Sequence, residues 1–359
     1  MDDVLTRLHD PYLGDSFAAL GATLDDEGKM LKLTLPYAGK GVASALQAAI
    51  NEAWGEQAPT LALDVDIATV PPAVPKPPIE GVKNIILVTS AKGGVGKSTV
   101  AANLALALAA EGARVGVLDA DLYGPSQAKM FGVEDQRPEV AGDRIKPVIG
   151  HGVQVASIAN HLNREDAPLI WRGAQLHSAL QTLLRQTQWD NVDYLIIDTP
   201  PGTGDVHLTL TQQIPIAGAV VVSTPQEIAL LDAKKGLKMF KQLRVPVLGV
   251  IENMNMFICP KCGHEEHIFG HDGAQLMSLQ YLVNFLGSLP LDRRIQAETD
   301  AGKPTVVAEP DSRIAELFRE MARKVGAAAI LASREREAVV PQTEADLHGG
   351  QVKEIKWNL

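Results

Sequence analysis

The sequence predicts an α/β fold in which a mostly parallel β-sheet is flanked by helices and preceded by a small α+β domain. Two observations support this prediction. Beyond residue 82, short segments that are apolar on both faces alternate with helix-length segments, which is typical of parallel strands covered by helices on both sides. A proline-rich stretch separates this region from an N-terminal part with its own patterns. The predicted strands of the large region are residues 85–88, 114–119, 153–158, 194–198, 219–223 and 247–251.

These patterns divide the chain into four parts. We expect a small α+β domain at residues 1–68, a linker at 69–81, a large domain at 82–333 and a polar C-terminal tail at 334–359. The tail follows an amphipathic segment at residues 313–331. The alanine-rich face of that segment suits a helix that packs on the large domain.

Three patterned segments define the small domain. Residues 31–35 alternate apolar and polar side chains as a half-buried strand does, residues 42–54 suit a helix, and residues 60–65 suit another strand. The loop at residues 36–41 contains no cysteine, so we expect this domain to dock or regulate partners without thiol chemistry. In the linker that follows, five prolines favour polyproline II and exclude a helix or a central strand.

A phosphate-binding loop opens the large domain. It lies between the apolar strand at residues 85–88 and a helix predicted at residues 100–110. Glycines let consecutive backbone N–H groups point into one concavity at the positive end of the helix, and such a site favours a polyphosphate. We expect ATP to bind through Ala91, Lys92, Gly93, Gly94, Val95, Gly96, Lys97, Ser98 and Thr99.

Three side chains of this loop have expected roles. Lys97 is predicted to reach the β- and γ-phosphates, Ser98 to offer its hydroxyl to Mg²⁺, and Thr99 to donate to the α-phosphate. A dinucleotide-binding loop is excluded because Thr99 occupies the place where G-x-G-x-x-G requires glycine. A glycine-rich turn without a ligand remains the alternative. Ala91 stands where the general triphosphate motif has its first glycine.

Aspartates follow two further apolar strands. One strand ends at Asp119, and Asp121 follows it. Another strand ends at Asp198, and Gly202 follows it. Because ligands gather at the carboxyl ends of parallel strands, we expect all four residues near the phosphates. Asp198 is predicted to bind Mg²⁺, Asp121 to position and activate the attacking water, Asp119 to help hold Mg²⁺ or Lys97, and the Gly202 amide to sense the γ-phosphate. Each aspartate alone is also compatible with a helix cap or a turn.

The two cysteines of the chain, Cys259 and Cys262, form one C-x-x-C motif. In a reducing compartment this spacing favours metal binding or redox chemistry over a structural disulfide. Two thiolates are half of the four ligands that a [4Fe–4S] cluster or a tetrahedral Zn²⁺ ordinarily takes. Three interpretations stay open: a second chain completes a bridging cluster, His267 and His271 complete a zinc site within one chain, or the pair is a redox dithiol.

The loop, with its additional Lys92, resembles the deviant Walker A motif of the MinD/ParA/nitrogenase-iron-protein class. Together with residues 119–126, 198–205 and 252–254 and the C-x-x-C motif, it resembles the Mrp/ApbC family of iron–sulfur cluster carrier P-loop ATPases. The small first domain also looks like one that accompanies iron–sulfur assembly ATPases.

This resemblance implies a homodimer in which Lys92 reaches the partner's nucleotide. It further implies that Cys259 and Cys262 of both chains hold a labile [4Fe–4S] cluster, and that slow ATP hydrolysis is coupled to transfer of the cluster. Iron–sulfur apoproteins and a scaffold donor are the implied partners. In the family, the residue that matches Asn253 reads the adenine edge, although a turn-forming asparagine is also compatible with this position.

Composition limits the remaining functions. A net charge of −10 and a pI of about 5.4 argue against nucleic-acid partners, which require cationic surfaces. No apolar run approaches the roughly 18 residues of a membrane span, and the N-terminus lacks an export signal, so we expect a cytoplasmic protein. The alternative functions are a MinD/ParA-type spatial-organiser ATPase with a structural zinc site, and an electron-transferring reductase like the nitrogenase iron protein.

Overall fold

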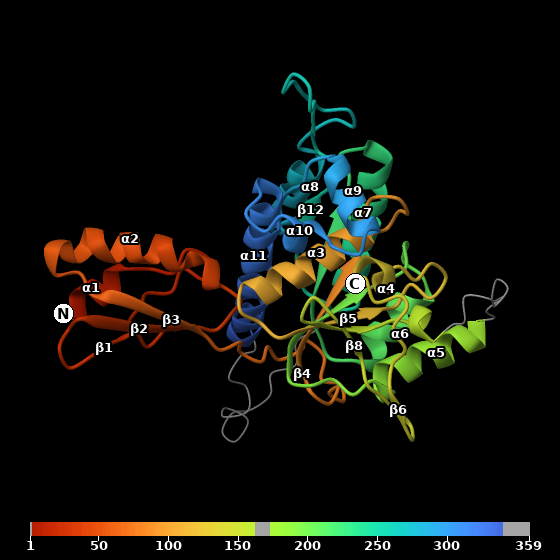
Figure 1. The fold of residues 1–359 in the computed structure, drawn as a ribbon, viewed down its shortest axis with the longest axis horizontal. Coiled ribbons are helices and arrows are strands. Elements are labelled where there is room, and N and C mark those ends of the chain that lie inside the picture. The colour runs from red at the N-terminus through yellow and green to blue at the C-terminus, as the bar shows by residue number, and fades with distance from the viewer. Residues whose placement is uncertain (1, 162–172, 340–359) are drawn as a thin grey trace, which may run out of the picture.

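The structure, a computed structural model, describes residues 2–161 and 173–339. Its larger part is built on one eight-stranded sheet, and the N-terminal domain lies beside it (Figure 1). All neighbouring strands of this sheet run parallel except β8 and β9. Across the sheet, the strands are β15 (Phe285–Ser288), β12 (Val247–Glu252), β11 (Ile216–Ser223), β4 (Val82–Thr89), β10 (Val192–Asp198), β5 (Val115–Asp119), β9 (Val153–Ala156) and β8 (Val148–Gly150).

Helices cover both faces of the sheet, so the predicted α/β architecture is confirmed. One core cluster joins a face of the sheet to α3 (Lys97–Ala110) and α11 (Arg313–Val339). On the other face the sheet packs against α5 (Gly173–Gln186), α6 (Asp205–Gln213), α7 (Glu227–Gln242) and α8 (Gly273–Tyr281). Short helices α4 (Gln127–Met130), α9 (Arg293–Asp300) and α10 (Thr305–Ala308) connect these elements.

The central strand β4 shows why the sequence forms a buried sheet. Its side chains alternate between the two cores: Ile86 and Val88 belong to the cluster with α3, whereas Ile85 and Leu87 belong to the opposite cluster. Because successive side chains of a strand point to opposite faces, the part of β4 that is buried in both cores, residues 85–88, is a continuous apolar run. The alanine-rich α3 contributes its small side chains to the core on one of these faces.

The N-terminal domain contains a three-stranded sheet in the order β1 (Thr23–Leu24), β2 (Met30–Leu35) and β3 (Thr60–Val65). The helices of the domain are α1 (Asp2–Arg7) and α2 (Ala43–Trp54). Strand β2 pairs with β1 antiparallel and with β3 parallel, and its residues alternate between exposed and buried. The two strands and the helix that the sequence predicts are therefore confirmed. Residues 69–81 form no helix or strand, as the prolines predict.

The two domains meet at the end of α3. Glu111, directly after this helix, accepts hydrogen bonds from Gly41 N (2.6 Å) in the N-terminal domain and from Arg323 Nη1 (2.7 Å) on α11. Arg323 also donates from Nε to the Tyr12 hydroxyl (3.0 Å) and pairs with Glu316 (2.6 Å). Burial raises the pKa of Glu111, and the Gly41 N–H and the Arg323 guanidinium oppose this shift.

The predicted start of the polar tail is wrong. Helix α11 continues through Arg334 and ends at Val339, because Arg, Glu and Ala at these positions favour a helix. Contacts with the rest of the chain anchor this end: Arg334 pairs with Asp15 (2.7 Å), and Arg336 Nη2 donates to the Pro71 carbonyl (2.7 Å). The remainder of the expected tail, residues 340–359, lies outside the described residues.

In the part of the chain that the structure describes, no helix is both long enough and apolar enough to cross a membrane.

Candidate functional site

The phosphate-binding loop connects β4 to α3 in the middle of the sheet. Strand β4 ends at Thr89 and α3 begins at Lys97. Gly94 and Gly96 have φ angles of 80° and 81°, in the left-handed region that glycine adopts without strain. A Cβ at Gly96 would collide with the side chain of Asn253. The loop therefore has the compact glycine geometry that places backbone N–H groups and a helix N-terminus around a phosphate.

Two buried carboxylates lie side by side at the carboxyl ends of β10 and β5. Asp198 pairs in register with Asp119 across these strands, and neither is exposed. Lys97 forms an ion pair with Asp198, and its Nζ donates to Ser98 Oγ (3.1 Å). Gln127 Nε2 donates to the second oxygen of Asp198 (2.7 Å). The structure thus brings together Lys97, Ser98 and Asp198.

The carboxylate pair has the chemistry of a Mg²⁺ site. Asp119 Oδ2 accepts from the backbone N–H groups of Ser126 and Gln127 and from Ser157 Oγ, whereas its buried Oδ1 has no partner. Burial and the neighbouring Asp198 raise the pKa of Asp119 to about 7. Two carboxylates against one lysine, with an oxygen left unpaired, fit a hard cation that prefers oxygen ligands.

Asp121 faces a cavity beside these carboxylates. The cavity has a volume of ≈ 580 Å³, and its walls include Asp121 and Tyr123 from the loop after β5, Pro201 from the loop after β10 and Asp205 from the start of α6. Asp121 is about half buried, and burial raises its pKa. Asp121 thus lies just after β5 and next to open space, and its role in positioning the attacking water stays a prediction.

Gly202 and Lys92 are both hydrogen-bonded to Ser90, the first residue after β4. The Gly202 N–H, predicted to sense a γ-phosphate, donates to the Ser90 carbonyl (2.8 Å) in this structure. Ser90 Oγ donates in turn to the Lys92 carbonyl (3.0 Å). A phosphate contact at Gly202 would therefore have to replace its bond to Ser90. Lys92 is partly exposed, and its predicted contact with a second chain stays a prediction.

Asn253 supports the phosphate-binding loop. Its Nδ2 donates to the Val95 carbonyl (2.9 Å), and its Oδ1 accepts from the Met254 N–H (3.0 Å). The side chain is 7% exposed. Both ends of the amide thus support the loop in this structure, and the adenine-reading role that the resemblance implies stays a prediction.

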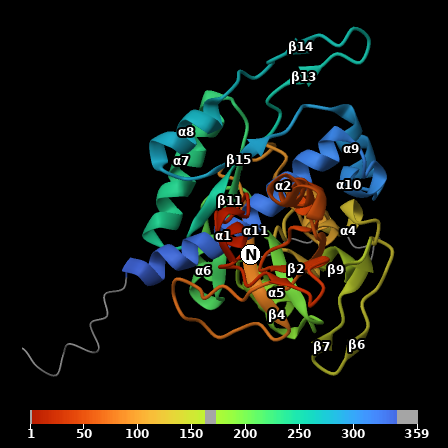
Figure 2. The same cartoon turned by 90° about the vertical axis from the view of Figure 1, so that its left-hand side faces the viewer.

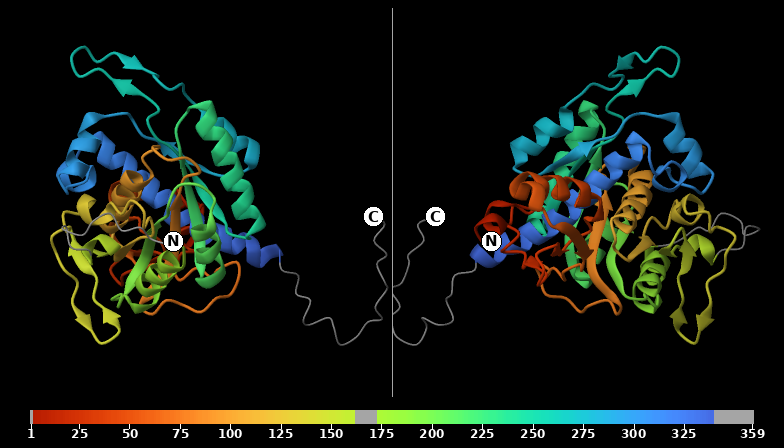
Figure 3. Two further views of the ribbon diagram at one scale, coloured as in Figure 1. Left: turned by 90° about the vertical axis from the view of Figure 1, so that its right-hand side faces the viewer. Right: turned by 60° about the vertical axis from the view of Figure 1, so that its left-hand side comes forward.

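The C-x-x-C motif lies in a hairpin of β13 (Phe257–Ile258) and β14 (Glu265–Glu266), which projects from the body of the molecule (Figures 2 and 3). The Cys259 N–H donates to the His264 carbonyl (2.9 Å) and the Gly263 N–H to the Cys259 carbonyl (2.9 Å). Cys262 is exposed and Cys259 partly so. Backbone N–H groups of Cys262 and Lys261 lower the pKa of the Cys259 thiol, which favours the thiolate that binds metals.

The four residues of the alternative zinc site are not brought together in this structure. His267 Nδ1 lies 2.8 Å from the Asn255 carbonyl, and His271 Nδ1 lies 2.7 Å from Asp272 Oδ2. Within residues 2–161 and 173–339, no three His, Cys, Asp or Glu side chains are grouped to hold a metal ion. The histidines follow the hairpin and bond near its base, while the cysteines lie in its turn, so the four residues do not converge.

Comparison with known proteins identifies the family. A family model described as ParA, NUBPL iron-transfer P-loop NTPase, matches residues 81–326, which is more than half of the chain. The chain belongs to this NUBPL family. As a member of a P-loop NTPase family it is a nucleotide hydrolase, in agreement with the predicted ATPase. The matched region begins where the linker ends, so the family assignment describes the large domain.

Curated relatives and a solved structure agree with the NUBPL family. The chain is 52% identical over 300 residues to an iron-sulfur cluster carrier protein of Haemophilus influenzae, covering 82% of this chain and 81% of the relative. It is 49% identical over 251 residues to the iron-sulfur cluster transfer protein NUBPL of Mus musculus, covering 69% and 78%. A nucleotide-binding protein of Archaeoglobus fulgidus in complex with ADP is 36% identical, with a TM-score of 0.57, covering 67% of this chain and 93% of that one.

The sequence analysis missed two residues of this site, Gln127 and His207. Gln127 directly follows the 119–126 segment, and its Nε2 also donates to the Ser98 carbonyl (3.1 Å). His207 is fully buried on α6, and its Nε2 lies 2.9 Å from Thr89 Oγ1 and 3.1 Å from Thr199 Oγ1. Both residues lie close in sequence to the aspartate motifs, and this was the available signal. A single sequence does not show, however, that a polar residue is buried.

Acid should destabilise the protein through His207. Burial, together with the charge of Lys97, lowers the pKa of His207 from 6.5 to about 4. The unfolded chain therefore binds an additional proton between these two values, and stability falls as the pH drops from about 6.5 to about 4, by at most about 3 kcal/mol. The measurement is the thermal midpoint of the nucleotide-free protein at pH 7 and pH 4.5, for wild type and His207→Gln. The variant should lose less stability in acid, and an equal loss in both would contradict the prediction.

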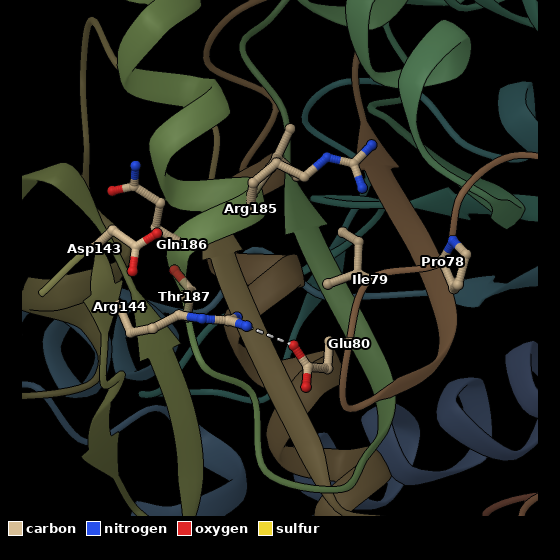
Figure 4. A pocket seen from close by; sticks show the side chains of 9 residues that line it. Pro78, Ile79, Glu80, Asp143, Arg144, Arg185, Gln186 and Thr187 are labelled. Atoms are coloured by element: carbon tan, nitrogen blue, oxygen red, sulfur yellow. Dashed lines mark hydrogen bonds and ion pairs between the residues drawn. The ribbon is translucent and has the colours of Figure 1, made fainter. Parts of the chain in front are cut away.

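A second cavity lies at the other ends of the strands, away from the phosphate-binding loop. It has a volume of ≈ 300 Å³, and its lining includes Ile79, Glu80, Arg144 and Thr187 (Figure 4). Arg144 pairs with Glu80 across it (2.8 Å). Glu80 and Thr187 precede β4 and β10, so this cavity is at the amino ends of the strands, whereas ligands of open α/β sheets bind at the carboxyl ends. It is therefore separate from the nucleotide site.

Proposed function

We propose that this protein binds and slowly hydrolyses ATP with Mg²⁺, holds a [4Fe–4S] cluster between two copies of the chain, and passes the cluster to apoproteins. The observation that carries the proposal is the pair of an exposed Cys262 and a partly exposed Cys259 on a hairpin that projects from a P-loop NTPase (Figure 2). One chain supplies two thiolates, and a [4Fe–4S] cluster takes four. A second chain would supply the missing two.

The names of the relatives favour this function over the MinD/ParA-type organiser. Proteins about 50% identical to this chain are named iron-sulfur cluster carrier or transfer proteins. The organiser alternative also included a structural zinc site, which the described residues do not form. Iron–sulfur apoproteins and a scaffold donor are the partners we propose, and the reducing cytoplasm is the compartment in which both cysteines stay available as thiolates.

In the nucleotide site, the residues of the chain bind and orient the reactants. The loop amides and Lys97 would neutralise the phosphate charge, and Ser98 and Asp198 would hold Mg²⁺, with Asp119 beside them. Bound Mg²⁺ supplies further charge neutralisation as the phosphoryl group is transferred. Asp121, at the wall of the cavity, would orient the attacking water.

The nucleotide would influence the dimer through the segment after β10. The Gly202 N–H donates to Ser90, and a γ-phosphate that accepts the same N–H would displace this bond. Helix α6 begins three residues later, at Asp205, so the exchange would move the start of α6 together with the loop. Lys92 would complete the partner's site across the dimer. Ordering of such segments by a γ-phosphate is a common switching mechanism in P-loop proteins.

Metal analysis of anaerobically purified protein tests the proposal. After reconstitution with iron and sulfide, the wild-type protein should contain about four iron atoms per dimer and absorb broadly near 400 nm. Cys259→Ser should lose nearly all of this iron, because a dimer of this variant keeps only two of the four thiolates that the cluster needs.

His267→Gln is the matched control in the same segment. A cluster held by the four cysteines should keep its iron in this variant, whereas a zinc site that uses His267 should lose its metal. Zinc in place of iron, or a full iron content in Cys259→Ser, would refute the proposed function.

A further inference from the structure

His207 lies beneath the two loops that form the nucleotide site. It is the third residue of α6, the helix that begins directly after the glycine-containing segment 202–204. Its ring is fully buried between the ends of β4 and β10, and it packs edge-on against Phe240 of α7 with ring centroids 6.3 Å apart. Its Nε2 contacts Thr89, the last residue of β4, and Thr199, the residue after Asp198.

The hydrogen-bond pattern favours one tautomer of this ring. Thr199 Oγ1 donates its hydrogen to the Val88 carbonyl (3.0 Å), so towards His207 it can only accept. With this direction, Nε2 carries the hydrogen of a neutral ring, and Nδ1 carries the lone pair. Nδ1 is buried and has no partner. In the opposite tautomer, Nδ1–H would be buried without an acceptor, and the lone pair of Nε2 would face a lone pair of Thr199 Oγ1. Both arrangements cost free energy.

Through these contacts, one N–H fixes two chain segments that carry nucleotide ligands. Thr199 is covalently next to Asp198, whose carboxylate pairs with Lys97. Thr89 precedes Ser90, whose carbonyl accepts from the Gly202 N–H. A displacement of the His207 ring would therefore change the position of Asp198 relative to the phosphate-binding loop.

We propose that His207 is a positioning residue for nucleotide hydrolysis, whose neutral Nε2–H holds the ends of β4 and β10 so that Asp198 and Gly202 stand in fixed relation to Lys97. The proposal rests on the proposed ATP hydrolysis at this site. His207 does not touch the nucleotide in this role, because Thr89 and Thr199 lie between. Its loss should reduce the rate of hydrolysis more than the affinity for nucleotide.

Two amide substitutions separate positioning from packing. In His207→Gln, the amide nitrogen reaches close to the place of Nε2 and can donate to Thr199. In His207→Asn, the amide reaches only the place of Nδ1. Both variants bury one amide, so both should lose thermal stability. We expect kcat for ATP within about threefold of wild type in His207→Gln and a loss of about tenfold or more in His207→Asn, with the Kd for MgADP changed less than about twofold in both.

Two further variants serve as controls. Phe240→Leu removes the ring that packs on His207 but none of its hydrogen bonds, so it should lower the thermal midpoint and keep kcat. Thr199→Val keeps the shape of the residue and removes the acceptor, so it should reproduce the loss seen in His207→Asn. The double variant of His207→Asn and Thr199→Val should be no slower than the slower single variant, because both remove the same bond.

The outcomes distinguish this inference from the proposed function. Equal kcat values in His207→Gln and His207→Asn, or a loss in Phe240→Leu as large as in His207→Asn, would overturn the positioning role while wild-type ATPase activity stands. If the wild-type protein shows no ATP turnover, the proposed function fails, and hydrogen exchange of the amides at residues 199–204 decides the inference. Exchange should then be faster in His207→Asn than in His207→Gln, and equal exchange would overturn it.

Discussion

Replacing Lys97 with methionine is expected to lower ATP turnover by about a hundredfold or more. Lys97 is the buried cation of the site, paired with Asp198 and 3.1 Å from Ser98. It would neutralise charge on the β- and γ-phosphates, and methionine keeps the length of the side chain without its charge. The measurement is single-turnover hydrolysis of ATP, with circular dichroism to verify folding.

Lys83→Met is the matched control for this variant. Lys83 lies on the same strand, β4, near its opposite end, where it pairs with Asp193 (3.1 Å). It is remote from the carboxyl ends of the strands, so its replacement should change turnover by less than about twofold. A turnover in Lys97→Met similar to that of Lys83→Met would contradict the assignment of the nucleotide site.

Arg323→Met should destabilise the protein by about 3 kcal/mol or more, because it leaves a buried carboxylate without its charged partner. The side chains of Arg323 and Glu111 are 7% and 1% exposed. After the substitution, Glu111 would lose its bond to the guanidinium and keep the bond from the Gly41 N–H. Urea unfolding measures the effect as a change in the free energy of unfolding.

Arg319→Met provides the matched control one turn earlier on α11. Arg319 pairs with Glu316 at 2.8 Å, and these side chains are 21% and 38% exposed, so this pair should contribute only about 0–1 kcal/mol. Combining Arg323→Met with Glu111→Gln removes both charges and should recover part of the lost stability. Equal effects of Arg323→Met and Arg319→Met would show that the buried network does not join the domains as described.

The sheet and the nucleotide loop could be predicted because both depend on local sequence. The parts of β4 and β10 that are buried on two faces are apolar runs, residues 85–88 and 195–197, and the loop motif lies within nine residues, 91–99. The order of the aspartates along the chain sufficed to predict that they meet, since parallel strands bring their carboxyl ends to one edge. The register of Asp198 with Asp119 confirms that reasoning.

What could not be predicted depends on contacts between residues distant in the sequence. Asn253 bonds to a carbonyl of the loop 158 positions away, and Arg323 joins Glu111 and Tyr12 from 212 and 311 positions away. A polar side chain carries no local sign of its partner, so neither role follows from pattern. The extra helical turns of α11 were missed for the same reason, because Arg334 and Arg336 find partners in the first 71 residues.

Helix α3 has a consequence for communication within the protein. It begins at Lys97 in the nucleotide loop and ends one residue before Glu111, which Gly41 of the N-terminal domain and Arg323 hold. Its 14 residues span about 21 Å as one hydrogen-bonded rod. A bound phosphate that displaced one end of this helix would therefore also displace the other end. Such a displacement would change the contact between Glu111 and the small domain, and with it the surface that this domain offers to a partner.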